Sequence, residues 1–262
     1  MENSIKVVSI VGPTASGKTK LSVELAKHFN GEIVSADSMQ IYSGMQIATA
    51  KPTKAEMDGV PHHMMGFLPP DKTYSVASYV NDASKCIADI HSRGMLPFIV
   101  GGTGLYVDSL LNNISFSDDK RDEEYCSRLR KIGEEDGTDR LLDMLSEFDP
   151  ESAQRLRGGR NIKRIIRAIE FYKTTGKTIT EQIKESHNIP SPYSAVKLGL
   201  NCRDRQVLYD RINRRVDIML DEGLLEEAQR VINSELSYTS VKAIGLSLIH
   251  ISEPTRPRLI SY

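Results

Sequence analysis

The residues best suited to chemistry begin at Gly12, where the sequence reads GPTASGKT over residues 12–19. This run matches the Walker A pattern, in which glycines let the backbone curl so that its N–H groups surround a phosphate. Lys18 is expected to reach the outer phosphate oxygens, and Thr19 to hold Mg²⁺ through its hydroxyl. The predicted phosphate site comprises Gly12, Pro13, Thr14, Ala15, Ser16, Gly17, Lys18 and Thr19.

A second polar group follows the apolar run GEIVSA at residues 31–36. In a parallel α/β sheet, ligands bind outside the carboxyl ends of the strands, so Asp37 and Gln40 are expected to face the same crevice as the phosphate site. A carboxylate there could act as a general base or could hydrogen-bond to the ligands of Mg²⁺. Asp37 could equally cap a following helix, because Asp is common at that position.

A third group follows the run LPFIV at residues 96–100 and reads GGTGLY. Most P-loop ATPases and GTPases carry an Asp after such a strand to help hold Mg²⁺, and no acid follows this one. The glycines let the backbone approach a ligand closely. Thr103 then offers a hydroxyl to that ligand, or caps a helix predicted over residues 104–112.

The elements that must position these groups form an α/β pattern. The β-branched run KVVSIV at residues 6–11 predicts a buried strand that ends at Gly12, and helical spacing starts at Thr19. Further strands are expected at 31–36, 96–100 and 195–201. Between them, residues 117–192 consist of charged, helix-forming segments with few β-branched runs and indicate a helical insertion.

Within this insertion, helices are predicted over 122–135 and 138–148, with a break at Asp149-Pro150. A third helix, over 160–175, has an apolar stripe and an opposite basic face. Such a basic face is either a solvated surface or a phosphate contact. The basic face consists of Arg160, Lys163, Arg164 and Arg167.

A long helix predicted over residues 204–222 carries more arginines. Arg211 and Arg215 are four residues apart and therefore share a face, from which they could clamp a diphosphate. Surface ion pairs with Asp210 and Asp217 are the alternative explanation.

Composition bounds the remaining possibilities. The 262 residues are 39% hydrophobic and 26% charged, which is ordinary for a globular protein. The sequence contains no apolar run near the roughly 18 residues of a membrane span, and its first residues do not read as a secretion signal, so a cytoplasmic protein is expected. The net charge of −1 means that nucleic-acid binding must use local basic faces. A monomer is expected, because no segment reads as a self-pairing seam.

Six separated blocks, spread over about residues 5–245, resemble bacterial tRNA dimethylallyltransferases in order and spacing. The blocks are GPTASGKT at 12–19, SADSMQIYSGMQIATAKP at 35–52, PHHMMGFLPPDKTYSVASY at 61–79, IVGGTGLY at 99–106, KRIIRAIEFYKTTGK at 163–177 and LYDRINRRVDIML at 208–220.

This resemblance implies transfer of a dimethylallyl group from dimethylallyl diphosphate to N6 of the adenosine just 3′ of the anticodon, in tRNAs that read codons beginning with U. It also implies that residues 16–19 hold the diphosphate with Mg²⁺, that Asp37 is the base, that Thr103 contacts the acceptor nucleotide and that Arg215 binds the diphosphate. The positions that match the family's tRNA contacts are Asp37, Ser38, Met39, Gln40, Thr103, Lys163, Arg164, Ile165, Ile166 and Arg167.

The resemblance implies the fold as well: an α/β, P-loop NTPase-like three-layer core with a parallel sheet and an inserted helical subdomain. The core is expected over 1–116 and 193–245, with a tRNA-contacting helical insertion over 117–192. Residues 246–262 (LSLIHISEPTRPRLISY) depart from the family pattern, resemble translated adapter sequence and are expected to be a non-native end. Cys126 stands where the family usually has an arginine, and the run 157–160 (RGGR) replaces the usual His-Pro-Asn turn.

Two other classes stay open on the residues alone. A P-loop small-molecule kinase would transfer a γ-phosphate and would need the acid that is missing after residues 96–100. A nucleotide-regulated RNA-binding module would carry no chemistry, and Asp37 would then be dispensable.

Overall fold

The computed structural model describes residues 4–114, 122–159 and 161–232. The tail predicted to be non-native, 246–262, and Arg160 lie outside the described residues. By internal contacts the chain divides into two compact units. We call Met1–Leu111 with Ser191–Tyr262 the sheet unit, and Asn112–Pro190 the helical unit.

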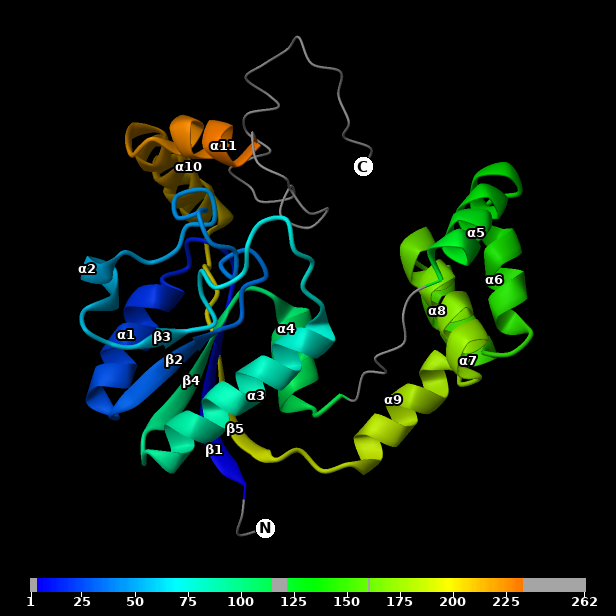
Figure 1. The fold of residues 1–262 in the computed structure, drawn as a ribbon, viewed down its shortest axis with the longest axis horizontal. Helices are drawn as coiled ribbons and strands as arrows, with labels where there is room; N and C mark the ends of the chain where they lie inside the picture. Colours follow the sequence, from blue (N-terminus) through cyan, green and yellow to red (C-terminus); the bar gives the residue numbers. More distant parts are fainter. Residues whose placement is uncertain (1–3, 115–121, 160, 233–262) are drawn as a thin grey trace. The chain divides into compact units, whose positions relative to one another are not determined.

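The sheet unit contains a five-stranded sheet in the order β3-β2-β4-β1-β5, in which every neighbouring pair is parallel (Figure 1). The strands are β1 (Ile5–Val11), β2 (Gly31–Ser35), β3 (His62–His63), β4 (Leu96–Gly101) and β5 (Tyr193–Gly199). The strand predicted at 195–201 begins and ends two residues earlier, because β5 pairs with β1 along its whole length, from Tyr193 opposite Ile5 to Gly199 opposite Val11.

Helices cover both faces of this sheet. Alternating strand residues point to opposite faces, and neighbours such as Ile33 and Val34 therefore enter two different cores. Helix α1 packs on one face, and α3 and α4 pack on the other (Figure 1). The helices of this unit are α1 (Lys18–His28), α2 (Lys54–Met57), α3 (Val76–Ser92), α4 (Gly104–Leu111), α10 (Arg205–Asp221) and α11 (Leu224–Ile232). The predicted three-layer α/β class is confirmed.

The helical unit is built around its own apolar core. Its helices are α5 (Glu123–Glu135), α6 (Thr138–Ser146), α7 (Pro150–Arg157), α8 (Ile162–Thr175) and α9 (Ile179–Asn188). Cys126 is fully buried in this core beside Leu129, so the position that differs from the family pattern serves packing. The break predicted at Asp149-Pro150 is present, since α6 ends at Ser146 and a further helix, which the sequence did not predict, begins at Pro150. Asp149 caps a new helix by accepting from the Ser152 N–H at 3.0 Å, with Pro150 in the first turn, where a missing N–H costs nothing.

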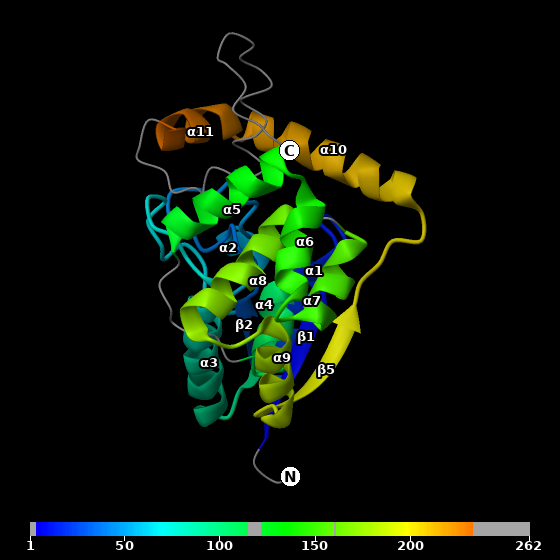
Figure 2. The same cartoon turned by 90° about the vertical axis from the view of Figure 1, so that its right-hand side faces the viewer.

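An ion-pair network joins β2, β3 and the end of α3 at the sheet edge. The buried Glu32 carboxylate accepts from Arg93 Nη2 at 2.7 Å and lies 2.6 Å from His63 Nε2. The hydrogen bonds from Arg93 lower the pKa of Glu32 from 4.5 to about 2. Figure 2 shows the opposite edge of the sheet, where β5 lies outermost.

We expect Glu32→Gln to lower the free energy of unfolding near pH 7 by about 1–3 kcal/mol, because a buried acceptor loses its charge-assisted partners. A carboxyl whose folded pKa is lowered stabilises the protein above its unfolded pKa, and this contribution is lost as pH falls toward the folded value. The difference between wild type and variant should therefore be largest above about pH 5 and shrink toward about pH 2. Urea unfolding at several pH values measures it.

The matched control for this variant is Asp89→Asn, since Asp89 is an exposed partner of the same Arg93 at 2.9 Å. It should change the free energy of unfolding by less than about 1 kcal/mol. A wild-type-to-Glu32→Gln difference that stays constant with pH would show that the Glu32 charge does not stabilise the fold.

Candidate active site

The phosphate cradle lies between β1 and α1. Its turn needs left-handed backbone at Ala15 (φ 61°) and at Gly17 (φ 92°), and Gly17 forms the N-cap of α1. Gly12 has a different reason to be glycine: a Cβ there would lie 2.7 Å from the carbonyl oxygen of Leu200, just after β5. The N-terminus of α1, with its outward N–H groups, adds positive potential to the cradle.

The side chains of Lys18 and Ser16 in the cradle suit the binding of an anion. Lys18 Nζ donates to the carbonyl oxygens of Gly12 at 2.9 Å and Pro13 at 2.7 Å, so its ammonium is folded back over the turn. Burial lowers the pKa of Lys18; nearby Asp37 opposes this shift and Arg215 adds to it. Among the described residues the buried Ser16 hydroxyl finds no hydrogen-bond partner, which is unusual and fits a ligand in the cradle.

Asp37 lies just beyond β2 and lines the same crevice. Its Oδ1 accepts from the backbone N–H of Met39 at 2.9 Å and of Gln40 at 3.3 Å. The capping geometry is therefore present, but it closes a turn, because no helix follows over residues 38–41. Both bonds use Oδ1, and within the described structure this leaves Oδ2 for a proton or a cation.

Thr103 joins the ends of β2 and β4. Its Oγ1 accepts from the Ser38 N–H at 3.0 Å, and its own N–H donates to the Ala36 carbonyl at 3.1 Å. The hydroxyl thus bonds toward the Asp37 turn, which disfavours its alternative use as a helix cap. Gly101 makes this contact possible, since a Cβ there would lie 2.2 Å from the Ala36 carbonyl oxygen.

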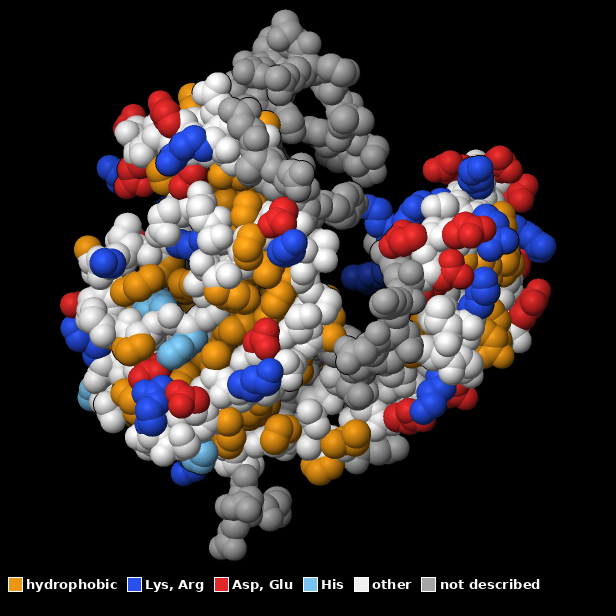
Figure 3. All heavy atoms as spheres, viewed as in Figure 1, with side chains coloured by type: hydrophobic (Ala, Val, Ile, Leu, Met, Phe, Trp, Pro, Cys, Tyr) orange, Lys and Arg blue, Asp and Glu red, His pale blue; other side chains and the backbone are white. Residues whose placement is uncertain are grey.

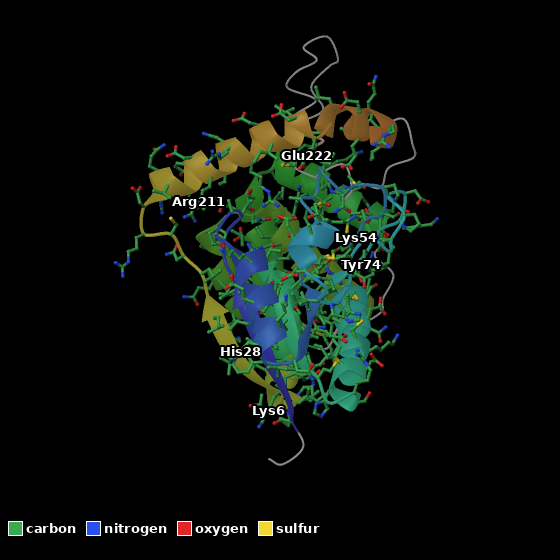
Figure 4. All side chains as sticks on the ribbon, turned by 90° about the vertical axis from the view of Figure 1, so that its left-hand side faces the viewer. Lys6, His28, Lys54, Tyr74, Arg211 and Glu222 are labelled. Atoms are coloured by element: carbon green, nitrogen blue, oxygen red, sulfur yellow. The ribbon has the colours of Figure 1, made fainter. Side chains whose placement is uncertain are left out.

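Helix α10 lies over the carboxyl ends of the strands, as Figure 4 shows by the labelled Arg211 and Glu222 at the end of the sheet unit opposite Lys6 and His28. Arg215 lines the crevice, and its Nη2 donates to the Ala50 carbonyl at 3.2 Å. Arg211 is exposed and does not line the crevice, so the structure brings one of the two predicted arginines to the cradle.

The crevice joins these groups in one space of about 730 Å³. Its polar lining includes Lys18, Thr19, Asp37, Thr103 and Arg215. The rest of its lining mixes polar side chains, among them Gln40, Glu56 and His62, with apolar ones. The apolar lining comprises Ile33, Met39, Ala48, Met65, Val100, Ile212, Val216 and Met219. One crevice thus offers a phosphate cradle, a carboxylate and a hydrocarbon-compatible surface.

The basic residues predicted on α8 belong to the helical unit. Lys163 and Arg164 are exposed, whereas Arg167 is ion-paired with the buried Glu170. Ile165 and Ile166 are buried in the core of the unit, so their side chains do not present a surface. On the face visible in Figure 3, the helical unit shows basic and acidic side chains interleaved.

Sequence reasoning missed the segment from Met45 to Lys51, which lies beside Arg215 and Gln40. The Ala50 carbonyl accepts from both Arg215 Nη2 and Gln40 Nε2, each at 3.2 Å. The role of a backbone carbonyl cannot be predicted from the types and spacing of side chains in the sequence. The segment is held by the buried Glu227 of α11, and the sequence gives no sign of this contact.

The parallel sheet, the glycine turn before α1 and the cations around it define a P-loop α/β protein built to hold a phosphate chain. A family model described as IPP transferase matches residues 40–251, and one described as isopentenyl transferase matches residues 5–65. The tRNA dimethylallyltransferase of Halalkalibacterium halodurans is 49% identical over 241 residues, covering 92% of this chain and 76% of that protein. The chain belongs to the tRNA dimethylallyltransferase family.

Other similar proteins and solved structures carry names of the same family. The tRNA dimethylallyltransferase of Oceanobacillus iheyensis is 49% identical over 249 residues, covering 94% of this chain and 79% of that protein. The full-length tRNA isopentenylpyrophosphate transferase of Bacillus halodurans, a solved structure, has a TM-score of 0.64 at 45% identity and covers 94% of this chain and 77% of its own. A eukaryotic dimethylallyltransferase solved while acting on tRNA has a TM-score of 0.74 at 28% identity, covering 95% of this chain and 64% of its own.

Proposed function

We propose that this protein transfers the dimethylallyl group of dimethylallyl diphosphate to N6 of the adenosine 3′-adjacent to the anticodon, in tRNAs that read codons beginning with U, and releases diphosphate. The observation that carries the proposal is the single crevice that places the phosphate cradle, Asp37 and apolar side chains together. The names of the relatives support it, since they describe dimethylallyl transfer to tRNA.

In this reaction the diphosphate is the leaving group. Breaking the allylic C–O bond builds positive character on carbon and negative charge on the departing oxygens. The loop amides, the Lys18 ammonium and the Arg215 guanidinium, which line the crevice, would stabilise that negative charge. The apolar side chains of the lining would limit access of water to the allylic carbon and so slow its hydrolysis.

The incoming nucleophile is an adenine amine, which is hardly basic and must lose a proton as the C–N bond forms. Asp37 Oδ2 is the group proposed to accept that proton. Its other oxygen is held by two backbone N–H groups, which fixes the carboxylate beside the crevice. Thr103, bonded to the backbone N–H of Ser38, would hold the same turn in register.

The donor set fits Mg²⁺. Magnesium prefers oxygen ligands and keeps several waters while bridging substrate phosphates through one or two protein oxygens. The Thr19 hydroxyl would supply such an oxygen in the crevice, and the described residues contain no group of three or more His, Cys, Asp and Glu that would form an all-protein cage. When bound with diphosphate, the ion would neutralise charge on the leaving group.

The tRNA side of the proposal uses both units. The target base lies stacked in the anticodon loop and must be turned out into the crevice, at a cost of a few kcal/mol that phosphate contacts can offset. Gln40, Met39 and Ser38 line the crevice for that base, and the exposed Lys163 and Arg164 are proposed to contact the backbone. A monomer is proposed, since no segment of the sequence reads as a self-pairing seam. Within the described part of the chain, no helix has the length and apolar character to cross a bilayer.

The test is to incubate the protein with Mg²⁺, dimethylallyl diphosphate and unmodified tRNA and to analyse the digested tRNA by mass spectrometry. Prenylated adenosine, absent when the target adenosine is replaced by guanosine, is the expected result. Brisk transfer of the γ-phosphate of ATP to a small acceptor, with no prenylated adenosine, would overturn the proposal in favour of a kinase.

A further inference from the structure

A buried carboxylate from α11 holds a loop segment that lies about 180 residues earlier in the chain. Glu227 Oε2 accepts from the backbone N–H groups of Gln46 at 2.9 Å and Ile47 at 3.0 Å, and its Oε1 accepts from that of Ala48 at 2.8 Å. The residue is 4% exposed. Three charge-assisted hydrogen bonds to consecutive amides fix this segment firmly.

The held segment continues into a tight turn. The Ala50 N–H donates to the Ile47 carbonyl at 2.8 Å, and Ala50 adopts a left-handed backbone with φ 51°. That conformation is unfavourable for alanine and persists only where the surroundings enforce it. The next residue, Lys51, is buried, and its ammonium donates to the carbonyl of Tyr42. The direction of the Ala50 carbonyl is therefore set by the turn that Glu227 holds.

The Ala50 carbonyl faces the site. It accepts from Arg215 Nη2 at 3.2 Å and from Gln40 Nε2 at 3.2 Å, while Ser35 Oγ donates to Gln40 Oε1 at 3.1 Å. Arg215 lies close enough to Lys18 to affect its pKa. One carbonyl thus connects the guanidinium above the phosphate cradle with the amide predicted to contact tRNA.

We infer that Glu227 is a positioning residue for diphosphate binding: by holding residues 46–48 it orients the Ala50 carbonyl, which in turn aims Arg215 at the cradle. The inference rests on the proposed function for the identity of the ligand as a diphosphate. Glu227 itself touches no ligand in this scheme, since it does not line the crevice.

The chemistry of the carboxylate makes the inference testable with a nearly isosteric change. A carboxylate accepts at both oxygens, whereas the amide of Glu227→Gln must turn an N–H₂ group toward at least one of the three backbone N–H donors. The turn would then shift, and Arg215 would lose its fixed acceptor. Diphosphate affinity should fall without any change to a group that contacts diphosphate.

The experiment titrates the full chain with inorganic diphosphate and Mg²⁺ by calorimetry, in a double-mutant cycle. We expect Glu227→Gln to weaken diphosphate binding about fivefold to tenfold in the wild-type background, but less than about twofold when Arg215 is already alanine. The matched control, Glu226→Gln, changes the exposed neighbour on the same helix and should leave the affinity unchanged. Glu227→Asp, with a shorter carboxylate, provides a second variant should Glu227→Gln not fold.

Equal weakening in both backgrounds would overturn the inference, because it would show that Glu227 acts on the fold and not through Arg215. Unchanged affinity in Glu227→Gln would overturn it too. Because the readout is binding of diphosphate alone, it is independent of prenyl transfer. A protein that binds diphosphate but prenylates no tRNA contradicts the proposed function and leaves this inference standing.

Discussion

Replacing Asp37 with Asn should slow prenyl transfer by about a hundredfold to ten-thousandfold, the range that a positioned general base contributes. Asparagine keeps an oxygen that can accept from the Met39 and Gln40 N–H groups, so the turn is expected to survive. What is lost is the oxygen that takes the proton from the adenine amine. Single-turnover assays with enzyme in excess measure this step apart from product release.

The affinity for unmodified tRNA separates this role from a structural one. Filter binding should give dissociation constants for Asp37→Asn and wild type within about threefold of each other, because the carboxylate acts on the proton in the transition state. Asp108→Asn, an exposed acid on α4, is the matched control and should leave the rate unchanged. Normal turnover by Asp37→Asn would eliminate Asp37 as the base.

Lys18→Met should reduce the rate of transfer by about a hundredfold to a thousandfold, the cost of removing one donor from a preorganised anion site. Methionine is also unbranched but cannot place a positive charge near the leaving diphosphate. Lys27→Met, at the other end of α1 and paired with exposed Asp58, is the control and should be neutral. Steady-state kinetics with dimethylallyl diphosphate as the varied substrate measure both variants.

The pH dependence of diphosphate binding gives an independent check on Lys18. Burial lowers the pKa of this ammonium from its ordinary value of 10.5. The unliganded protein therefore loses the charge at a lower pH than usual, and diphosphate affinity should decline as pH rises toward that lowered pKa. In Lys18→Met this part of the decline should be missing. Identical pH profiles for the two proteins would mean that the ammonium does not bind the ligand.

The sequence was enough to predict the parts of the site that depend on local chemistry. A phosphate-binding loop at residues 12–19 requires a strand before it and a helix after it. The β-branched run and the helical spacing predicted both elements, and the structure contains them as β1 and α1. The end of β2 placed Asp37 on the same side as the cradle because parallel strands share their carboxyl edge. Helical spacing offered Arg211 and Arg215 as candidates, and the family resemblance singled out Arg215, which lies more than a hundred residues away along the chain.

Other features depended on tertiary structure and left weak signals. The alternatives for Thr103 could be ranked only when its hydroxyl was found 3.0 Å from the Ser38 N–H. Helix α7 was missed because Asp149-Pro150 both ends one helix and begins the next. The Ala50 carbonyl has no side-chain signature, and the contact of Glu227 with residues 46–48 spans two-thirds of the chain.

The order in which the strands are synthesised determines when the phosphate cradle can be completed. Strand β1 is made first, yet one of its two neighbours, β5, is made only after the entire helical unit, and Leu200 abuts Gly12. Until then one border of β1 is open, a condition that invites mispairing with other chains. The helical unit, with its own core, can condense in the interval. Ligand capture is therefore expected to appear late in biosynthesis, after residue 200 has left the exit tunnel.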